Sequence, residues 1–287
     1  MSSPPARQGH GIQLSFYDFG ATTFFASQFD QRFSYCLYVP KNYSESEDKL
    51  YDLAVIVHGT GRTASQYRDR FADFADRNDC IVLAPLFPAG IGVAGDLANY
   101  KRILFHGIRY DQVLLSMVDE VAAKYRVRSQ RFLMYGFSGG GQFCQRFFLL
   151  HPERLQAVSI GAPGVVTLLN TDYDWWVGVR DIEQRFGRTL NLAAMREVAV
   201  QTIIGTADTA TWEITIPRDS ALWMDGAQLQ GDNRIERITA LADSFAAHGI
   251  RVQRDTVPGI AHEPFKVIEP VEAFLQQCLR TPQAASV

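Results

Sequence analysis

A serine lies inside a glycine-rich pentapeptide, Gly136-Phe137-Ser138-Gly139-Gly140, which matches the pattern G-x-S-x-G. The pentapeptide directly follows the apolar run RFLMY and directly precedes the helical stretch GQFCQRFFLL. A serine at such a strand-to-helix turn projects its hydroxyl above the sheet, and the flanking glycines remove side chains that would collide across the turn. The sequence therefore predicts that Ser138 is a nucleophile; the alternative is a glycine-rich turn with an incidental serine.

A serine hydroxyl needs a neighbouring base, and the chain has six histidines. His262 lies in VPGIAHEPF, a loop between the last predicted strand and the last predicted helix, where the upper edge of a parallel sheet presents side chains to Ser138. His10 lies near the N-terminus, and His151 and His248 end predicted helices, where a positive ring favours the helix dipole. We therefore predict that His262 is the base, with an ordinary surface-loop histidine as the alternative.

The base needs a carboxylate that fixes its tautomer and stabilises the imidazolium. Asp208 follows the predicted strand AVQTIIG in the turn GTADT, so its carboxylate reaches the same edge of the sheet. The alternative role for Asp208 is to cap the next segment. Three other acidic residues are weaker candidates because none directly follows a predicted strand: Asp172, Asp174 and Glu213.

Acyl transfer at a serine passes through a tetrahedral oxyanion, which two backbone N–H groups usually hold. Gly139 directly follows the predicted nucleophile and is expected to supply one of them. The turn His58-Gly59-Thr60-Gly61-Arg62 follows the apolar run LAVIV and is expected to supply the other. Thr60 is the first choice of donor and Gly61 the second, whereas a plain strand-ending turn is the alternative.

Strands that alternate with amphipathic helices must position these residues, and this pattern is typical of a mostly parallel sheet covered on both faces. The predicted strands are 33–39, 53–59, 80–86, 131–137, 156–161, 199–205 and 251–257. The predicted helices are 110–125, 139–150, 233–247 and a last one that begins at Pro264 and ends near Leu279. The first strand alternates most and is expected to be an antiparallel edge.

Three segments interrupt the alternation: 87–108, 162–198 and 209–231. The first is rich in glycine, and the other two surround the strand that precedes Asp208. We expect residues 1–11 to be a flexible tail and residues 12–280 to be a single domain, with a cap insertion at about 162–198 and a long loop at 209–231.

These motifs together resemble the α/β-hydrolase superfamily: the HG turn, GFSGG, GTAD and GIAH. The resemblance covers about residues 33–279, and the chain order Ser138, Asp208, His262 is the order that this superfamily uses. Within it, FSYCLYVPKNY followed by LAVIVHG looks like esterases of the polyhydroxybutyrate depolymerase and feruloyl-esterase kind. The resemblance implies a sheet of eight strands with one antiparallel, so an eighth strand is expected within 12–26. It also implies ester cleavage.

Substrate contacts are expected from the residues near these motifs and from the irregular segments. The candidates are His58, Arg62, Tyr100, His106, Phe137, Trp175, Trp176 and Trp212. The tryptophans are interpreted as an apolar wall for an acyl or aryl group, or as side chains that stiffen long loops or form a subunit contact. Arg62 is interpreted as a partner for a substrate carboxylate or as a member of a surface salt bridge.

Composition and charge narrow the class of partner. Of the 287 residues, 47% are hydrophobic and 21% are charged, and the formal net charge is −3, so neither a nucleic acid nor an anionic membrane is an expected partner. The N-terminal residues do not resemble a secretory signal, and the four cysteines show no paired metal spacing. We expect a cytoplasmic monomer or homodimer that needs no metal and no cofactor.

The sequence thus predicts a serine hydrolase that cleaves a carboxylic ester of a small organic substrate through an acyl-enzyme. An amidase or peptidase with the same residues is the nearest alternative, and its amide substrate has a poorer leaving group. A ligand-binding protein on a hydrolase fold, without catalysis, is the alternative from another class.

Overall fold

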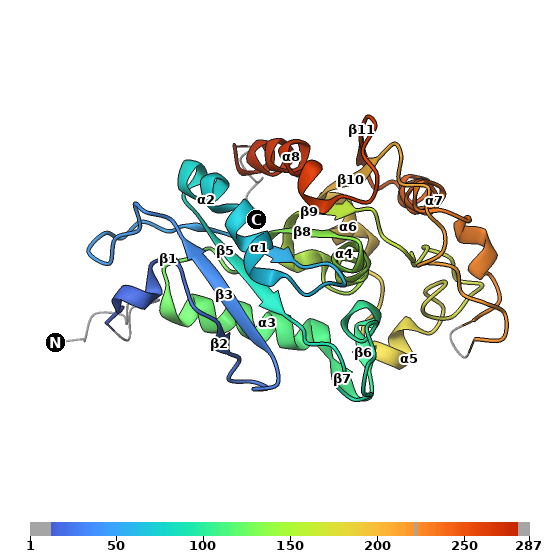
Figure 1. Ribbon diagram of the computed structural model, residues 1–287, viewed down its shortest axis with the longest axis horizontal. Helices are drawn as coiled ribbons and strands as arrows, with labels where there is room; N and C mark the ends of the chain where they lie inside the picture. The colour runs from blue at the N-terminus through green and yellow to red at the C-terminus, as the bar shows by residue number, and fades with distance from the viewer. Residues whose placement is uncertain (1–12, 221–222, 281–287) are drawn as a thin grey trace.

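A computed structural model describes residues 13–220 and 223–280, and it is built around one large sheet (Figure 1). The predicted tail, 1–11, lies outside the described residues. Within them the sheet has nine strands: β1 (Gly20–Ala21), β2 (Phe25–Ala26), β3 (Ser34–Val39), β4 (Asp52–Val57), β5 (Cys80–Leu86), β8 (Phe132–Phe137), β9 (Leu155–Gly161), β10 (Ala199–Gly205) and β11 (Val252–Val257). Their order is β1-β3-β5-β4-β8-β9-β10-β11, and β2 pairs with β3.

The sheet is mostly parallel, as the sequence predicted. From β5 to β11 every neighbouring pair is parallel, whereas β3 runs antiparallel to β5, β1 and β2. The strand expected within 12–26 is present as two short strands, β1 and β2, which both pair with β3. The antiparallel β3 therefore lies one strand inside the edge.

Both faces of the central strands are buried, which explains why their sequences are continuously apolar. In β4, Leu53, Val55 and Val57 pack into one core, while Ala54 and Ile56 pack into the other. The alternation follows the two-residue period of a strand.

Helices cover the two faces of the sheet. They are α1 (Ala64–Arg70), α2 (Ala72–Asn78), α3 (Tyr110–Lys124), α4 (Gly139–Leu150), α5 (Ile182–Phe186), α6 (Leu192–Glu197), α7 (Arg234–Ala247) and α8 (Ile268–Arg280). Helices α3 and α4 pack on one face, and α1, α2 and α8 pack on the other (Figure 1). The last helix begins later than predicted, because Pro264 starts a short 3₁₀ helix, η5 (Pro264–Lys266), and α8 follows it.

The irregular segments contain only short elements. Residues 87–108 hold η2 (Tyr100–Arg102) and β6 (Leu104–Phe105), which forms a two-stranded ribbon with β7 (Ile108–Arg109). Segment 162–198 holds α5 and α6, and 209–231 holds η4 (Ala227–Gln230). Two further 3₁₀ turns are η1 (Phe16–Asp18) and η3 (Pro152–Arg154). None of the helices in the part of the chain that the structure describes has the length and apolar character needed to cross a membrane.

Candidate active site

Ser138 occupies the sharp turn between β8 and α4. Its backbone has φ 58° and ψ −115°, a conformation that costs a non-glycine residue about 1–3 kcal/mol. The backbone N–H of Ser138 donates to Gly161 O at 2.8 Å, which ties the turn to β9. The surrounding structure thus holds the serine in a strained conformation, at the strand-to-helix turn that the sequence predicted.

The glycines around Ser138 are required because other backbone segments approach them closely. A Cβ atom at Gly136 would lie 2.5 Å from the Gly140 carbonyl, and one at Gly140 would lie 2.4 Å from Val57 O. A Cβ atom at Gly141 would lie 2.3 Å from Gly161 O. Helix α4 can therefore start directly against the ends of β4 and β9, with Ser138 at its N-terminal end.

His262 and Asp208 are hydrogen-bonded to each other. His262 Nδ1 lies 2.6 Å from Asp208 Oδ2, and the His262 ring packs against the ring of Phe137 with centroids 4.8 Å apart. The Asp208 side chain is fully buried, whereas a quarter of the His262 side chain is exposed. Because the carboxylate accepts at Nδ1, the proton of a neutral His262 lies on Nδ1, and Nε2 can accept a proton.

The turn after β10, which carries Asp208, is joined directly to the loop that carries His262. Ala207 N donates to Ile260 O at 2.9 Å, and Gly259 N donates to Thr206 Oγ1 at 2.9 Å. A Cβ atom at Gly205 would lie 2.1 Å from Ile260 O, so this approach requires a glycine. These contacts set the distance between Asp208 and His262.

Arg234, at the start of α7, is a member of the site that sequence reasoning missed. Its Nη1 lies 3.3 Å from Asp208 Oδ1, its Nη2 lies 2.7 Å from Glu213 Oε2, and its side chain is 2% exposed. Both carboxylate oxygens of Asp208 thus have a donor, one from His262 and one from Arg234. Glu213, weighed as an alternative acid, instead pairs with this arginine.

The two expected oxyanion donors lie next to each other. A Cβ atom at Gly139 would lie 3.1 Å from Thr60 Oγ1, so the turn after β4 and the start of α4 are in contact. Gly139 is the first residue of α4, where a backbone N–H has no partner within the helix. Among the described residues, the Thr60 N–H also donates no hydrogen bond. Both N–H groups therefore remain candidates to bind an oxyanion.

A pocket of about 570 Å³ joins these groups. It is lined by Gly59, Thr60, Gly61, Thr63, Tyr67, Leu97, Lys101, Phe137, Ser138, Gln142, Gly164, Trp212, Glu213, Ile214, Arg234, His262, Pro264 and Phe265. The structure therefore brings Ser138, His262 and the expected oxyanion donor Thr60 to one cavity, while Asp208 lies buried behind His262.

No family model and no curated protein matches this chain, but many solved structures do. Poly(aspartic acid) hydrolase-1 from Sphingomonas sp. KT-1 matches with a TM-score of 0.70 and 21% identity, over 88% of this chain and 97% of that one. A poly(3-hydroxybutyrate) depolymerase from Bordetella parapertussis matches with a TM-score of 0.65 and 22% identity, over 88% and 86%. A ferulic acid esterase matches with a TM-score of 0.58 and 16% identity, over 91% and 97%. The chain has the α/β-hydrolase fold. The sequence resemblance to depolymerases and feruloyl esterases therefore extends to the structure.

On this α/β-hydrolase scaffold, only two of the eight predicted substrate contacts, Phe137 and Trp212, line the pocket. Trp212 is 78% exposed, and Phe137 lies under His262. His106 is exposed in the turn between β6 and β7, packs edge-on against Phe105, and does not line the pocket.

Three predicted contacts instead support the turn after β4. His58 is fully buried, accepts from Phe87 N at Nε2 and donates to Gly59 O. Tyr100 is also buried and donates to His58 O at 3.0 Å. Arg62 donates to the carbonyl oxygens of Thr60, Phe87 and Leu97, so its guanidinium holds the turn and the 87–108 segment together. Their polar atoms are occupied by the protein itself, which the sequence pattern did not reveal.

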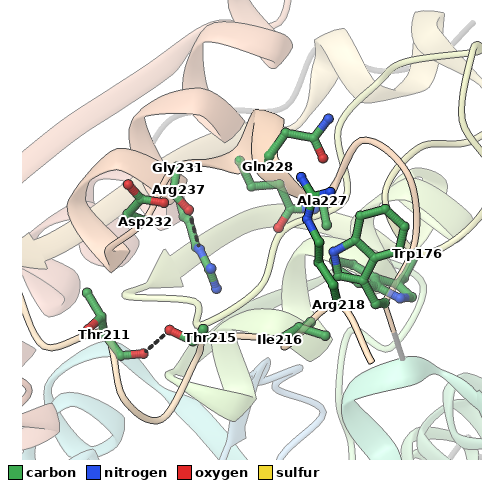
Figure 2. A pocket seen from close by; sticks show the side chains of 12 residues that line it. Trp176, Thr211, Thr215, Ile216, Arg218, Ala227, Gln228, Gly231, Asp232 and Arg237 are labelled. Carbon is green, nitrogen blue, oxygen red and sulfur yellow. Dashed lines mark hydrogen bonds between the residues drawn. The ribbon is translucent and has the colours of Figure 1, made fainter. Parts of the chain in front are cut away.

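Trp175 and Trp176 lie away from Ser138. Trp175 is buried against Phe186 and donates to Arg102 O, so it joins the 162–198 segment to η2. Trp176 lines a separate hollow, shown in Figure 2, together with Arg218 and Trp223. The predicted cap at 162–198 contributes only Gly164 to the wall of the Ser138 pocket, and the 209–231 segment contributes Trp212, Glu213 and Ile214.

The segment that carries Trp212 separates the two cavities. Thr211 and Thr215 face the hollow in Figure 2 and are joined by a hydrogen bond, whereas Trp212, Glu213 and Ile214 face the Ser138 pocket. A single turn of chain therefore forms a wall of both cavities.

Proposed function

We propose that the protein is a serine hydrolase that cleaves a carboxylic ester of a small organic substrate through an acyl-enzyme. The observation that carries the proposal is the shared geometry of three residues. Ser138 lies in a strained turn at the pocket that His262 also lines, and His262 is bonded to the buried carboxylate of Asp208. A serine and a histidine that met by chance would be expected to show neither the strained turn nor the hydrogen bond to a buried carboxylate.

The proton path follows from the hydrogen bond at Nδ1. Because Asp208 holds the Nδ1 proton, His262 Nε2 takes the proton of the Ser138 hydroxyl as the oxygen attacks the ester carbonyl. The N–H groups of Gly139 and Thr60 then stabilise the oxyanion, and His262 returns the proton to the leaving alcohol. In the second half, His262 activates water, which releases the acid and restores Ser138.

The matched structures support hydrolysis as the reaction class. The three proteins reported above are named as a hydrolase, a depolymerase and an esterase. An amide substrate would use the same residues but must expel a poorer leaving group. The proposal is therefore an esterase, and paired ester and amide substrates of one acid measure its preference.

A fluorophosphonate probe tests the proposal. We expect the probe to label Ser138 in the wild type, as read by intact mass and peptide mapping, and we expect Ser138→Ala to abolish both labelling and ester turnover. Ser116→Ala, on α3, is the matched control and should label as the wild type does. A folded wild type that is neither labelled nor active on p-nitrophenyl esters would overturn the proposal in favour of ligand binding without catalysis.

A further inference from the structure

The side chain of Lys101 lies against the expected oxyanion hole. Lys101 lines the Ser138 pocket, and a Cβ atom at Gly139 would lie 2.8 Å from Lys101 Cε. It belongs to η2, directly after the buried Tyr100 that supports the turn after β4. Its position is therefore set by the same contacts that form the site.

The ammonium of Lys101 has no partner among the residues that the structure describes. The other basic residue on the pocket wall, Arg234, pairs with Asp208 and Glu213. Among residues 13–220 and 223–280, Lys101 has no hydrogen bond through its ammonium and no carboxylate within 4 Å. A partly buried cation without a partner is costly, and such groups concentrate at functional sites.

A second cation adds to the positive field at this end of the pocket. The guanidinium of Arg62 donates to carbonyl oxygens and to Asn99 Oδ1, and among the described residues it forms no ion pair with a carboxylate. Burial, followed by the charge of Arg62, lowers the pKa of Lys101 to about 8. An anion bound beside Lys101 would relieve both the desolvation and the repulsion.

The location of Lys101 indicates which part of a substrate it meets. The leaving-group oxygen must face His262, which protonates it. Lys101 lies beside Gly139 and Thr60, where the carbonyl oxygen is held, so it meets the acyl part. A carboxylate a few carbon atoms from the scissile carbonyl is the group that pairs with it.

We propose that Lys101 binds a carboxylate on the acyl part of the substrate, so that the preferred substrates are half-esters of short dicarboxylic acids. This proposal rests on the proposed hydrolase function and names its substrate class. The cation acts as a specificity determinant, because an uncharged ester gains nothing from it.

Two esters of similar size test the assignment: monomethyl glutarate, which is an anion, and methyl pentanoate, which is neutral. With the wild type we expect a higher kcat/KM for the half-ester. Lys101→Met keeps the length of the side chain and removes the charge. This variant should lower kcat/KM for the half-ester by about tenfold to a hundredfold, which is the usual range for a hydrogen bond to a charged group. It should change kcat/KM for methyl pentanoate by less than about threefold.

Lys41→Met is the matched control, because Lys41 is 79% exposed and pairs with Asp76 at 2.9 Å, and its substitution should leave both esters unaffected. An equal fall for both esters in Lys101→Met would show that Lys101 stabilises the oxyanion instead. No change for either ester would remove Lys101 from the site. Each of these results overturns the proposal.

The pH dependence of the preference gives a second readout. We expect the ratio of kcat/KM for the half-ester to that for methyl pentanoate to fall as the pH rises through about 8, where Lys101 loses its charge. The ratio cancels the titration of groups that act on both esters alike. The charged or titratable groups that act on Lys101 or share its pocket are Arg62, Tyr67, Asp96, Arg102, Glu213, Arg234 and His262. A ratio that stays constant through this range contradicts the proposal.

Binding separates this proposal from the hydrolase function. Calorimetry with glutarate needs no turnover, and we expect glutarate to bind more tightly to the wild type than to Lys101→Met. Lys101-dependent glutarate binding by a protein that fluorophosphonate does not label would keep the anion site and overturn the hydrolase. Labelling of Ser138 without Lys101-dependent binding would keep the hydrolase and overturn the anion site.

Discussion

Asp208→Asn is the substitution whose effect the structure specifies most closely. The carboxylate of Asp208 accepts from Arg234 at Oδ1 and from His262 at Oδ2. Arg234 is only a donor, so the new amide must turn its carbonyl oxygen toward Arg234 and its NH₂ group toward His262. His262 Nδ1 then has to accept, its proton moves to Nε2, and the ring cannot take the proton of Ser138.

The expected loss in kcat is about 10⁴-fold, the size found where an asparagine imposes the wrong tautomer on a catalytic histidine. At about 1.4 kcal/mol per tenfold, this loss is about 5 kcal/mol of transition-state stabilisation. The assay is kcat on a short p-nitrophenyl ester together with the rate of fluorophosphonate labelling, and circular dichroism confirms folding. Asp172→Asn is the matched control, because Asp172 is exposed and lies outside the pocket wall.

A double variant tests the reason for the loss. In Asp208→Asn/Arg234→Met no donor holds the amide oxygen, so the amide can rotate and accept from His262 Nδ1. We expect kcat to recover by roughly tenfold or more over the single variant, a non-additive effect typical of groups that act as one unit. A folded Asp208→Asn enzyme within tenfold of the wild type would refute the assignment of Asp208. A double variant that shows no recovery would refute the role given to Arg234.

Two further predictions concern stability. Gly141→Ala places a Cβ atom 2.3 Å from Gly161 O and should lower the free energy of unfolding by about 1–3 kcal/mol. In the control Gly61→Ala the nearest contact is at 4.0 Å, so the free energy of unfolding should change by less than about 0.5 kcal/mol. Equal values for the two variants in urea unfolding would contradict the packing argument. Burial lowers the pKa of His58 to about 4. Between pH 6.5 and 4 the unfolded chain therefore binds more protons than the folded one, and the free energy of unfolding should fall by about 3 kcal/mol as the pH falls through this range. His58→Gln removes this titration, and an unchanged pH slope in that variant would show that His58 is not buried in its neutral form.

The proposed nucleophile, acid and base could be selected from the sequence because each depends on a short stretch of residues. The turn at Ser138 needs an apolar strand, small neighbours and a following helix, all of which lie within about 20 residues. Asp208 and His262 follow strands of a parallel sheet, whose carboxyl ends meet at one edge. The structure places both residues next to each other through contacts at that edge.

The surroundings of these residues could not be predicted in the same way. Arg62 and Tyr100 have the chemical groups to bind a substrate, but their donors are used by backbone oxygens of neighbouring turns. Trp175 and Trp212 lie in similar irregular stretches, yet one is buried and the other is 78% exposed. Residue type and spacing do not encode such differences, because they depend on how loops fold over one another.

Local sequence therefore specified the alternation of strands and helices, the serine turn, and the strand ends from which Asp208 and His262 project. Each of these features depends on backbone geometry and apolar period over a few residues. Only the tertiary structure decided that Arg234, 26 residues from Asp208, donates to its second oxygen. The same holds for Lys101, whose side chain lies beside Gly139 and whose ammonium has no partner in the described part of the chain. Whether a charge is paired or unpaired depends on the packing of distant segments. The desolvation that strengthens its electrostatic interactions exists only once those segments have packed.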